Sequence, residues 1–229
     1  MISNNLRLIR EQMADAAQKS GRNLSEIKLV AVSKRFPVEK IIEACGAGQL
    51  LFGENYIQEV AQKKPLAPQE VRIHFIGNLQ SNKAKIAAEF CDMVETVDRV
   101  KLGNALNKHC TTLDKTLKVL VQVNIGDDPN KSGVSREQTA TLISELNKLS
   151  HLKVCGLMTI PPLSNSPEES RVHFRNLRLL SEELSHQGLF QGTAQPELSM
   201  GMSEDFHIAI EEGATIIRVG TAIFGQRLT

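Results

Sequence analysis

Short runs of small and β-branched apolar residues recur along the chain, separated by longer amphipathic stretches. Runs of this length and composition are typical of strands that are buried on both faces. We predict eight strands, over residues 27–33, 50–53, 72–76, 93–97, 117–124, 153–159, 197–200 and 215–219.

The stretches between these runs have the spacing of helices. An opening helix is predicted over residues 5–19, where Leu6, Ile9, Met13 and Ala17 recur at helical intervals, and "KSGRN" ends it. Several later segments begin at Ser or Asp, which are good N-caps, and end at Gly. The predicted helices include "PVEKIIEACGAG", "SNKAKIAAEF", "RVKLGNALNKHC", "SREQTATLISELNKL", "ESRVHFRNLRLLSEELSHQ" and "SEDFHIAIEEG".

Eight strands alternating with helices predict a single α/β domain over residues 1–229, a (β/α)8 TIM barrel with an extra N-terminal helix. A doubly wound open sheet is the alternative, but that fold often carries a Gly-rich loop after its first strand, and none follows here. In a barrel, functional groups lie at the carboxyl ends of the strands, and a phosphate often binds after strands seven and eight.

Charge and cysteine content narrow the functional classes. With 27 basic and 26 acidic residues the net charge is +1, so neither nucleic acid nor an anionic membrane is an expected partner. The four cysteines show no C-x-x-C spacing and fit reduced thiols of a cytoplasmic protein. The six histidines show no metal-ligand spacing, and the N-terminal residues predict neither a secretion signal nor a membrane span.

The first apolar run ends on a lysine, Lys34. Such a lysine can simply lay its stem on apolar surface and extend its charged head into water. However, strand side chains alternate between faces, so Val30, Val32 and Lys34 share one face. If that face lines the barrel, Lys34 points into its mouth, where partial desolvation favours the uncharged amine that forms a Schiff base with a carbonyl.

Two loops near the end of the chain form a candidate anion site. In "LSMGMSEDF", Ser199, Gly201 and Ser203 precede a helix, whose free N–H groups and dipole favour an anion. In "RVGTAIFG", Gly220 and Thr221 offer backbone donors and a hydroxyl. Each motif alone is more typical of a plain turn, but together they indicate a phosphate site, and pyridoxal 5'-phosphate combines a phosphate with a carbonyl.

The position of Arg218 affects which reactions a bound pyridoxal phosphate could support. It is either a surface arginine beside a turn or, if the last strand is regular, a residue on the same face as Gly220. A guanidinium that faces the pyridine nitrogen disfavours its protonation. The ring is then a poorer electron sink, which argues against demanding carbanion chemistry.

An ordered set of motifs resembles the pyridoxal phosphate homeostasis protein family, formerly called the proline synthetase co-transcribed family. The resemblance covers residues from about 27 to 227, with Ile73 where that family often has tryptophan and Asp128 where glutamate is frequent. It implies a single barrel similar to the N-terminal domain of fold-type III alanine racemases. The motifs are "AVSK", "FGENYIQE", "HFIGNLQSNK", "QVN" followed by "NKSG", "GLMTIPP" and "ELSMGMSEDFHIAIEEGATIIRVGTAIFG".

By this resemblance, Lys34 is the Schiff-base lysine and Arg218 faces the pyridine nitrogen. Around the phosphate, Ser199, Gly220 and Thr221 are expected, with Gly201 in the same loop. Asn55 and Met158 occupy motif positions at the cofactor rim. The resemblance implies a PLP carrier or regulator rather than a catalyst, with PLP-dependent apoenzymes as candidate acceptors.

Three functions remain open from the sequence. The first is a PLP-binding homeostasis protein, expected to be a monomer because no apolar interface stripe is evident. The second is an amino-acid racemase, which needs an acid–base group opposite Lys34, and the candidates are His74 and the only tyrosine, Tyr56. The third is a barrel enzyme in which Lys34 forms a Schiff base with a phosphorylated sugar.

Overall fold

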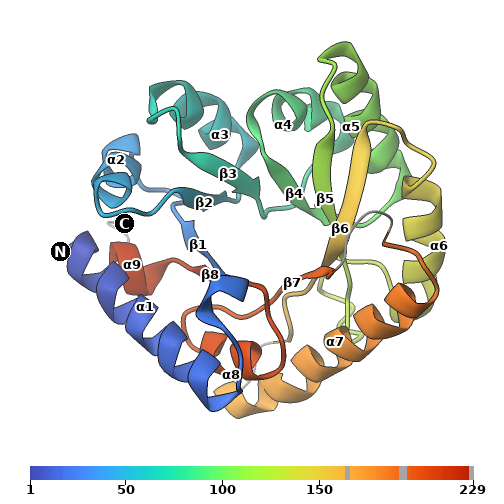
Figure 1. Cartoon of the computed structure of the whole chain (residues 1–229). Helices are drawn as coiled ribbons and strands as arrows, with labels where there is room; N and C mark the ends of the chain where they lie inside the picture. The colour runs from blue at the N-terminus through green and yellow to red at the C-terminus, as the bar shows by residue number, and fades with distance from the viewer. Residues whose placement is uncertain (163–165, 191–194, 227–229) are drawn as a thin grey trace.

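The eight predicted strands form a closed parallel barrel in chain order, with β8 paired to β1 (Figure 1). The computed structural model describes residues 1–162, 166–190 and 195–226. The predicted TIM barrel is therefore confirmed. The strands are β1 (Lys28–Val32), β2 (Leu51–Glu54), β3 (Arg72–Phe75), β4 (Met93–Val97), β5 (Leu117–Gln122), β6 (Leu152–Met158), β7 (Glu197–Ser199) and β8 (Ile216–Val219).

Helices surround the barrel, as Figure 1 shows, and the extra N-terminal helix α1 packs against α8 and α9 near the end of the chain. The helices are α1 (Ile2–Lys19), α2 (Val38–Gly46), α3 (Ile57–Lys63), α4 (Ala84–Phe90), α5 (Val100–Thr112), α6 (Arg136–Leu146), α7 (Arg171–His186), α8 (Phe206–Glu211) and α9 (Thr221–Phe224), with short 3-10 turns η1 (Leu24–Glu26), η2 (Lys64–Leu66), η3 (Ser81–Lys83) and η4 (Pro167–Ser170). No helix in the described ranges is long and apolar enough to cross a bilayer.

The strand boundaries agree with the apolar runs to within two residues. The fifth strand shows the largest difference, since it was predicted to reach residue 124 and ends at Gln122. Beyond it, the N–H of Val123 still donates to the carbonyl of Met158 in β6, but Val123 also forms an isolated bridge with Val134, and the N–H of Asn124 donates to the carbonyl of Val134. The pairing therefore becomes irregular directly after Gln122, which accounts for the difference.

The core has two parts. The larger part lies between the strands and the surrounding helices. A smaller cluster fills the barrel interior with one or two side chains from each of five strands, namely Val30, Met93, Leu120, Cys155, Met158 and Ile216. Because both faces of the strands are covered, their sequences are apolar without interruption.

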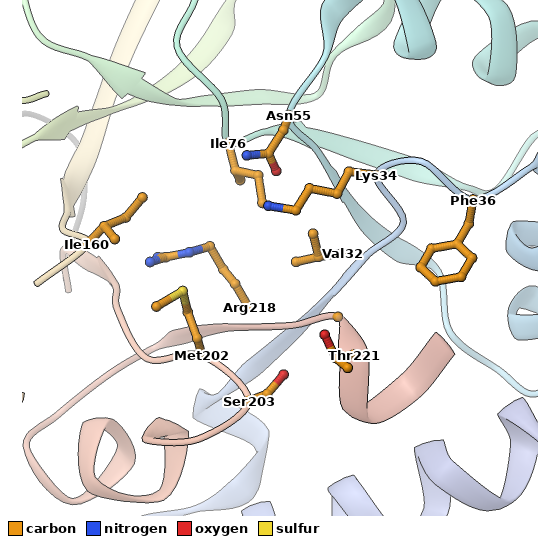
Figure 2. A pocket seen from close by; sticks show the side chains of 11 residues that line it. Val32, Lys34, Phe36, Asn55, Ile76, Ile160, Met202, Ser203, Arg218 and Thr221 are labelled. Carbon is orange, nitrogen blue, oxygen red and sulfur yellow. The ribbon is translucent and has the colours of Figure 1, made fainter. Parts of the chain in front are cut away.

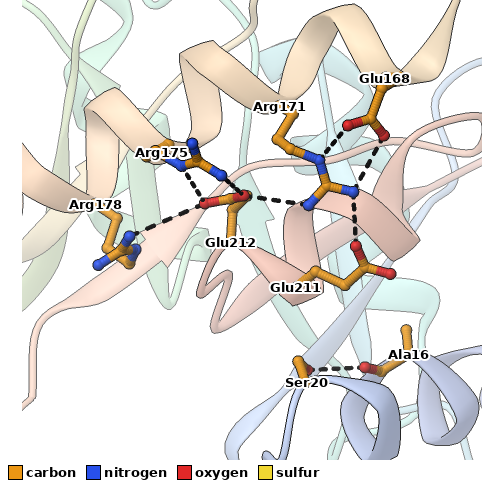
Figure 3. A network of polar contacts seen from close by, with 8 residues as sticks. All are labelled: Ala16, Ser20, Glu168, Arg171, Arg175, Arg178, Glu211 and Glu212. Atoms are coloured by element: carbon orange, nitrogen blue, oxygen red, sulfur yellow. Dashed lines mark hydrogen bonds and ion pairs between the residues drawn. The ribbon is translucent and has the colours of Figure 1, made fainter.

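An arginine–glutamate network fastens α8 to α7 (Figure 3). The buried Glu212, directly after α8, accepts hydrogen bonds from Arg171 and Arg175 at 2.9–3.2 Å and lies 4.0 Å from Arg178. Arg171 also donates to Glu211 at 2.7 Å. Since α8 follows the loop after β7, the network fixes a segment that leads to the barrel rim.

Replacing Glu212 by Gln should lower the free energy of unfolding by about 1–3 kcal/mol at pH 7, because the carboxylate that the arginines face is lost. Burial acts to raise the pKa of Glu212, but the hydrogen bonds and charges of Arg175 and Arg171 outweigh it and hold that pKa below its ordinary value. A carboxyl group of this kind stabilises the fold above its unfolded-state pKa of about 4.3 and loses that effect as the pH falls through the folded-state pKa.

The stability difference between the wild type and Glu212→Gln should therefore be full at pH 7 and shrink below pH ~4, as measured by urea unfolding at each pH. Glu183→Gln on α7 is the matched control, since Glu183 is half exposed and 3.6 Å from its partner Arg136. It should change stability by less than about 0.5 kcal/mol. Equal effects of the two substitutions would contradict the assignment.

Candidate functional site

A cavity of about 200 Å³ opens at the carboxyl ends of the strands. Figure 2 shows that its walls come from segments far apart in the sequence. The lining residues belong to β1, to β8 or to the start of α9, or they follow β1, β2, β3, β6, β7 and β8; they are Val32, Lys34, Phe36, Asn55, Ile76, Ile160, Met202, Ser203, Arg218, Gly220 and Thr221. Five of the eight predicted cofactor-binding residues are among them: Lys34, Asn55, Arg218, Gly220 and Thr221.

Lys34 extends from the end of β1 into this cavity, toward Asn55 (Figure 2). The alternation that was predicted for β1 holds, because Val30 lies in the barrel interior while Val32 and Lys34 line the cavity above it. Lys34 is half-buried. The next residue, Arg35, has φ +64°, so the chain turns sharply away from the cavity directly after the lysine.

A buried ionic cluster behind β1 holds this turn. The ammonium of Lys63 donates to the carbonyl of Ser33 at 2.9 Å and to the carboxylates of Glu54 and Glu59 at 2.8 and 2.5 Å. Glu59 also accepts the backbone N–H of Arg35 at 2.8 Å, which supports the left-handed conformation there. The residues directly before and after Lys34 are therefore both held by hydrogen bonds to their backbone groups.

Arg218 is fully enclosed by the barrel, with 3% of its surface exposed. Its guanidinium donates to the hydroxyl of Ser199 at 2.6 Å and to the carbonyl of Thr159 at 2.8 Å. In Figure 2 it lies between Ile160 and Met202, at the side of the cavity across from Lys34. The cavity therefore has a permanent positive charge in its wall.

A carboxylate inside the barrel compensates this charge. Glu95 of β4 is completely buried; one oxygen accepts the Ser199 hydroxyl at 2.5 Å, and the other lies 2.6 Å from Nδ1 of His74. Burial acts to raise the pKa of Glu95, but the hydrogen bond and charge of His74, the charge of Arg218 and the Ser199 hydroxyl together lower it below its ordinary value. His74, Glu95, Ser199 and Arg218 thus form a continuous polar chain across the barrel, which we call the interior chain.

The remaining wall of the cavity is suited to an anion. Ser203 and Thr221, which both carry a hydroxyl group, line the side of the cavity next to α9 (Figure 2). Thr221 begins α9, and the first N–H groups of a helix have no carbonyl partner within it. Gly220 precedes them, and a Cβ there would lie 3.3 Å from Val32, so the close approach of β8 to β1 favours glycine.

The three other predicted residues lie next to the cavity without lining it. Met158 belongs to the apolar cluster in the barrel interior, and the hydroxyl of Ser199 is bonded to Glu95 and Arg218. Gly201 has φ +90°, and a Cβ there would lie 2.5 Å from that of Ala209, so it is the residue that lets the loop after β7 pack on α8.

Asn55 has an unsatisfied group. Its side-chain oxygen is buried and has no hydrogen-bond partner within the described part of the chain, although the residue lines the cavity. The adjoining loop is held close, because a Cβ on Gly77 would lie 2.1 Å from the carbonyl oxygen of Asn55. An unpaired buried acceptor costs free energy unless a ligand or water supplies a donor.

Glu95 is the residue that sequence reasoning missed. Its signal was a carboxylate in the middle of the buried run 93–97, where an unpaired charge is costly. The racemase candidates lie elsewhere: Tyr56 is 42% exposed and accepts a hydrogen bond from Arg35, while His74 belongs to the interior chain. No cluster of potential metal ligands occurs among the described residues.

Comparisons with known proteins find relatives that match nearly the whole chain. A family model described as "Alanine racemase, N-terminal domain" matches residues 3–228. The Pyridoxal phosphate homeostasis protein of Haemophilus influenzae is 41% identical, with 99% of this chain and 96% of that protein covered. The protein of the same name from Escherichia coli K12 is 40% identical, with 99% and 97% covered.

Solved structures show the same fold. PipY of Synechococcus elongatus PCC7942, solved with PLP bound, has a TM-score of 0.85 and 34% identity, with 98% of this chain and 100% of that chain covered. An alanine racemase of Clostridium difficile 630 has a TM-score of 0.73 at 16% identity and covers 99% of this chain but 58% of its own. The second likeness concerns the barrel fold alone.

Replacing Glu95 by Gln should lower the free energy of unfolding by about 3–5 kcal/mol, because the buried guanidinium of Arg218 loses its counter-charge. Urea unfolding followed by circular dichroism measures this change. Asp98→Asn, just after the same strand, is the control; Asp98 pairs with Arg99 near the surface, and its loss should cost about 1 kcal/mol or less. A Glu95→Gln protein as stable as the control would show that the interior chain carries no charge compensation.

Proposed function

Because the chain belongs to the family of the alanine racemase N-terminal domain, we propose that it binds pyridoxal 5'-phosphate (PLP) at the carboxyl ends of the strands and takes part in intracellular PLP homeostasis. The observation that carries the proposal is one small cavity that joins an amine, a guanidinium and an anion-binding wall. The proposal treats residues 1–229 as one PLP-binding domain.

The residues present fit the cofactor. PLP carries an aldehyde, a pyridine nitrogen and a phosphate. In this assignment, the amine of Lys34 takes the aldehyde as a Schiff base with release of water, and Arg218 faces the pyridine nitrogen. The carboxamide of Asn55, whose oxygen has no partner among the described residues, is available to a polar ring substituent.

The phosphate belongs, in this proposal, at the wall made by Ser203, Gly220 and Thr221. Hydroxyls and helix-start N–H groups are suitable partners for a phosphate. Ser199 then acts through Arg218, which it holds by a 2.6 Å hydrogen bond. Met158 supports the floor of the site from the barrel interior, and Gly201 supports the loop that carries Ser203.

A carrier role fits the cavity better than catalysis. Racemisation needs a second acid–base group opposite the lysine. Among the described residues that line the cavity there is no Tyr, His, Cys, Asp or Glu. A permanently charged guanidinium at the ring nitrogen also weakens the electron sink that carbanion chemistry requires.

The proposal also covers the acceptors of the cofactor, the cellular location and the oligomeric state. PLP-dependent apoenzymes are the proposed acceptors of the cofactor, and the cytoplasm is the proposed location. The protein is proposed to act as a monomer, which size-exclusion chromatography with light scattering tests directly.

Purified protein should be yellow, and borohydride should fix a phosphopyridoxyl group on Lys34. The visible absorption spectrum before and after reduction, followed by peptide mass spectrometry, measures both. Lys34→Ala should be colourless, while Lys85→Ala, which removes an exposed lysine of α4, should keep the colour of the wild type. A wild-type protein that fails to capture added PLP at Lys34 would overturn the proposal and favour a phosphorylated-sugar substrate.

Incubation of the PLP-loaded protein with enantiopure amino acids should leave their optical activity unchanged. The expected reason is the absence of an acid–base partner for Lys34 among the described lining residues. Chiral chromatography measures the product, and an authentic alanine racemase serves as the positive control. Enzyme-dependent loss of optical activity that disappears in Lys34→Ala would instead support the racemase.

A further inference from the structure

A second and larger cavity, of about 560 Å³, opens at the opposite mouth of the barrel, where the strands begin. Neither the proposed function nor the interior chain accounts for the charge of its walls. Five cationic side chains line it, against two carboxylates, Asp92 and Glu197. These seven side chains therefore carry a formal net charge of +3. The five cations are Lys28, Arg72, Lys115, Lys118 and Lys153.

Strand alternation places four of these cations on the inward faces of their strands. Lys28, Lys118 and Lys153 each lie two residues before a side chain of the interior cluster, namely Val30, Leu120 and Cys155. Side chains two residues apart point to the same face of a strand. The same spacing relates Arg72 to His74 of the interior chain. The amino-end mouth is therefore ringed by inward-facing cations from β1, β3, β5 and β6.

Two of these lysines stand directly opposite each other. Lys118 of β5 and Lys153 of β6 are register partners in neighbouring strands. Both act with Lys28 on the thiol of Cys155: burial raises the pKa of Cys155, and the three lysines oppose that rise. Like charges opposite one another in a sheet destabilise it.

Internal contacts neutralise only part of this charge. Lys28 pairs with Glu197, and Lys115 donates to the carbonyls of Ala88 and Cys91. Within the described part of the chain, the guanidinium of Arg72 and the ammonium of Lys118 have no hydrogen bond or ion pair. Two of the cations that line the cavity therefore have no internal counter-charge among the described residues.

We propose that the amino-end cavity binds a phosphorylated small molecule with two or more negative charges. Guanidinium and ammonium groups are the side-chain groups that bind phosphate in proteins, and this cavity is lined by one guanidinium and four ammonium groups. The volume exceeds that of the cofactor cavity, so there is room for more than the phosphate itself. The site is separated from Lys34 by the barrel interior and does not depend on PLP binding.

Isothermal titration calorimetry with inorganic pyrophosphate tests the site. The wild type should bind one pyrophosphate at this site with a dissociation constant tighter than about 1 mM, and Lys118→Gln/Lys153→Gln should bind it at least about tenfold more weakly. The matched control is Lys101→Gln/Lys108→Gln, which removes the same charge from exposed positions of α5 and should bind like the wild type. Equal loss in both double variants would indicate only a general charge effect and would overturn the proposal.

Thermal unfolding supplies a second measurement, because substitution of lysines that are merely solvated would not change the melting temperature in the way expected here. In buffer without phosphate, Lys118→Gln/Lys153→Gln should melt at a higher temperature than the wild type, because the opposed charges are gone. Pyrophosphate should stabilise the wild type more than the variant. A variant that melts lower than the wild type without ligand would show that the lysines serve the fold and would overturn the proposal.

Two further experiments identify the chemical class of the ligand and the cavity in which pyrophosphate binds. Adenosine monophosphate should compete with pyrophosphate, whereas citrate of similar charge should compete poorly; equal competition by citrate would overturn the phosphate assignment. Thr221→Val, in the other cavity, should leave pyrophosphate binding unchanged. Loss of binding in Thr221→Val alone would place the pyrophosphate at the carboxyl ends and overturn the inference, whatever the outcome of the PLP experiments.

Discussion

The contact between Arg218 and Glu95 through Ser199 is the constraint on which the site depends. A guanidinium with 3% of its surface exposed is tolerable only where a counter-charge and acceptors surround it. Glu95 supplies the charge from across the barrel, and Ser199 links the two with hydrogen bonds of 2.5 and 2.6 Å. The arginine is thus fixed in the cavity wall by the barrel itself rather than by a mobile loop.

Lys34 is fixed in a different way, by the turn that follows its strand. The ionic cluster of Lys63, Glu54 and Glu59 bonds the backbone on either side of the lysine. The arginine–glutamate network around Glu212 fastens α8 (Figure 3), and α8 begins shortly after the loop that contains Ser203. Side chains that do not line the cavity therefore help to set its shape, as expected for a preorganised site.

The two mouths of the barrel differ in their charge for a structural reason. At the carboxyl ends, one lysine and one arginine share a small cavity with hydroxyls and apolar side chains. At the amino ends, several cations crowd a wider cavity with few carboxylates. The apolar interior cluster separates the two, and His74 alone among the interior chain reaches the amino-end mouth. The barrel therefore presents two chemically distinct sites on one axis.

The sequence by itself determined the barrel, because buried parallel strands are apolar along their whole length. The polar and glycine residues that end these apolar runs mark the strand ends in the sequence. Alternation within single strands predicted that Lys34 shares a face with Val32 and Arg218 with Gly220, but it left a surface position open for both. Only the tertiary structure decided which partners they have: Ser199 and Glu95 are 104 residues apart in the chain, and no local pattern relates them. The serine could be recognised beside a helix start, but whether its hydroxyl faced a ligand or a buried carboxylate depended on closure of the barrel, which brings β4 and β7 to the same interior layer.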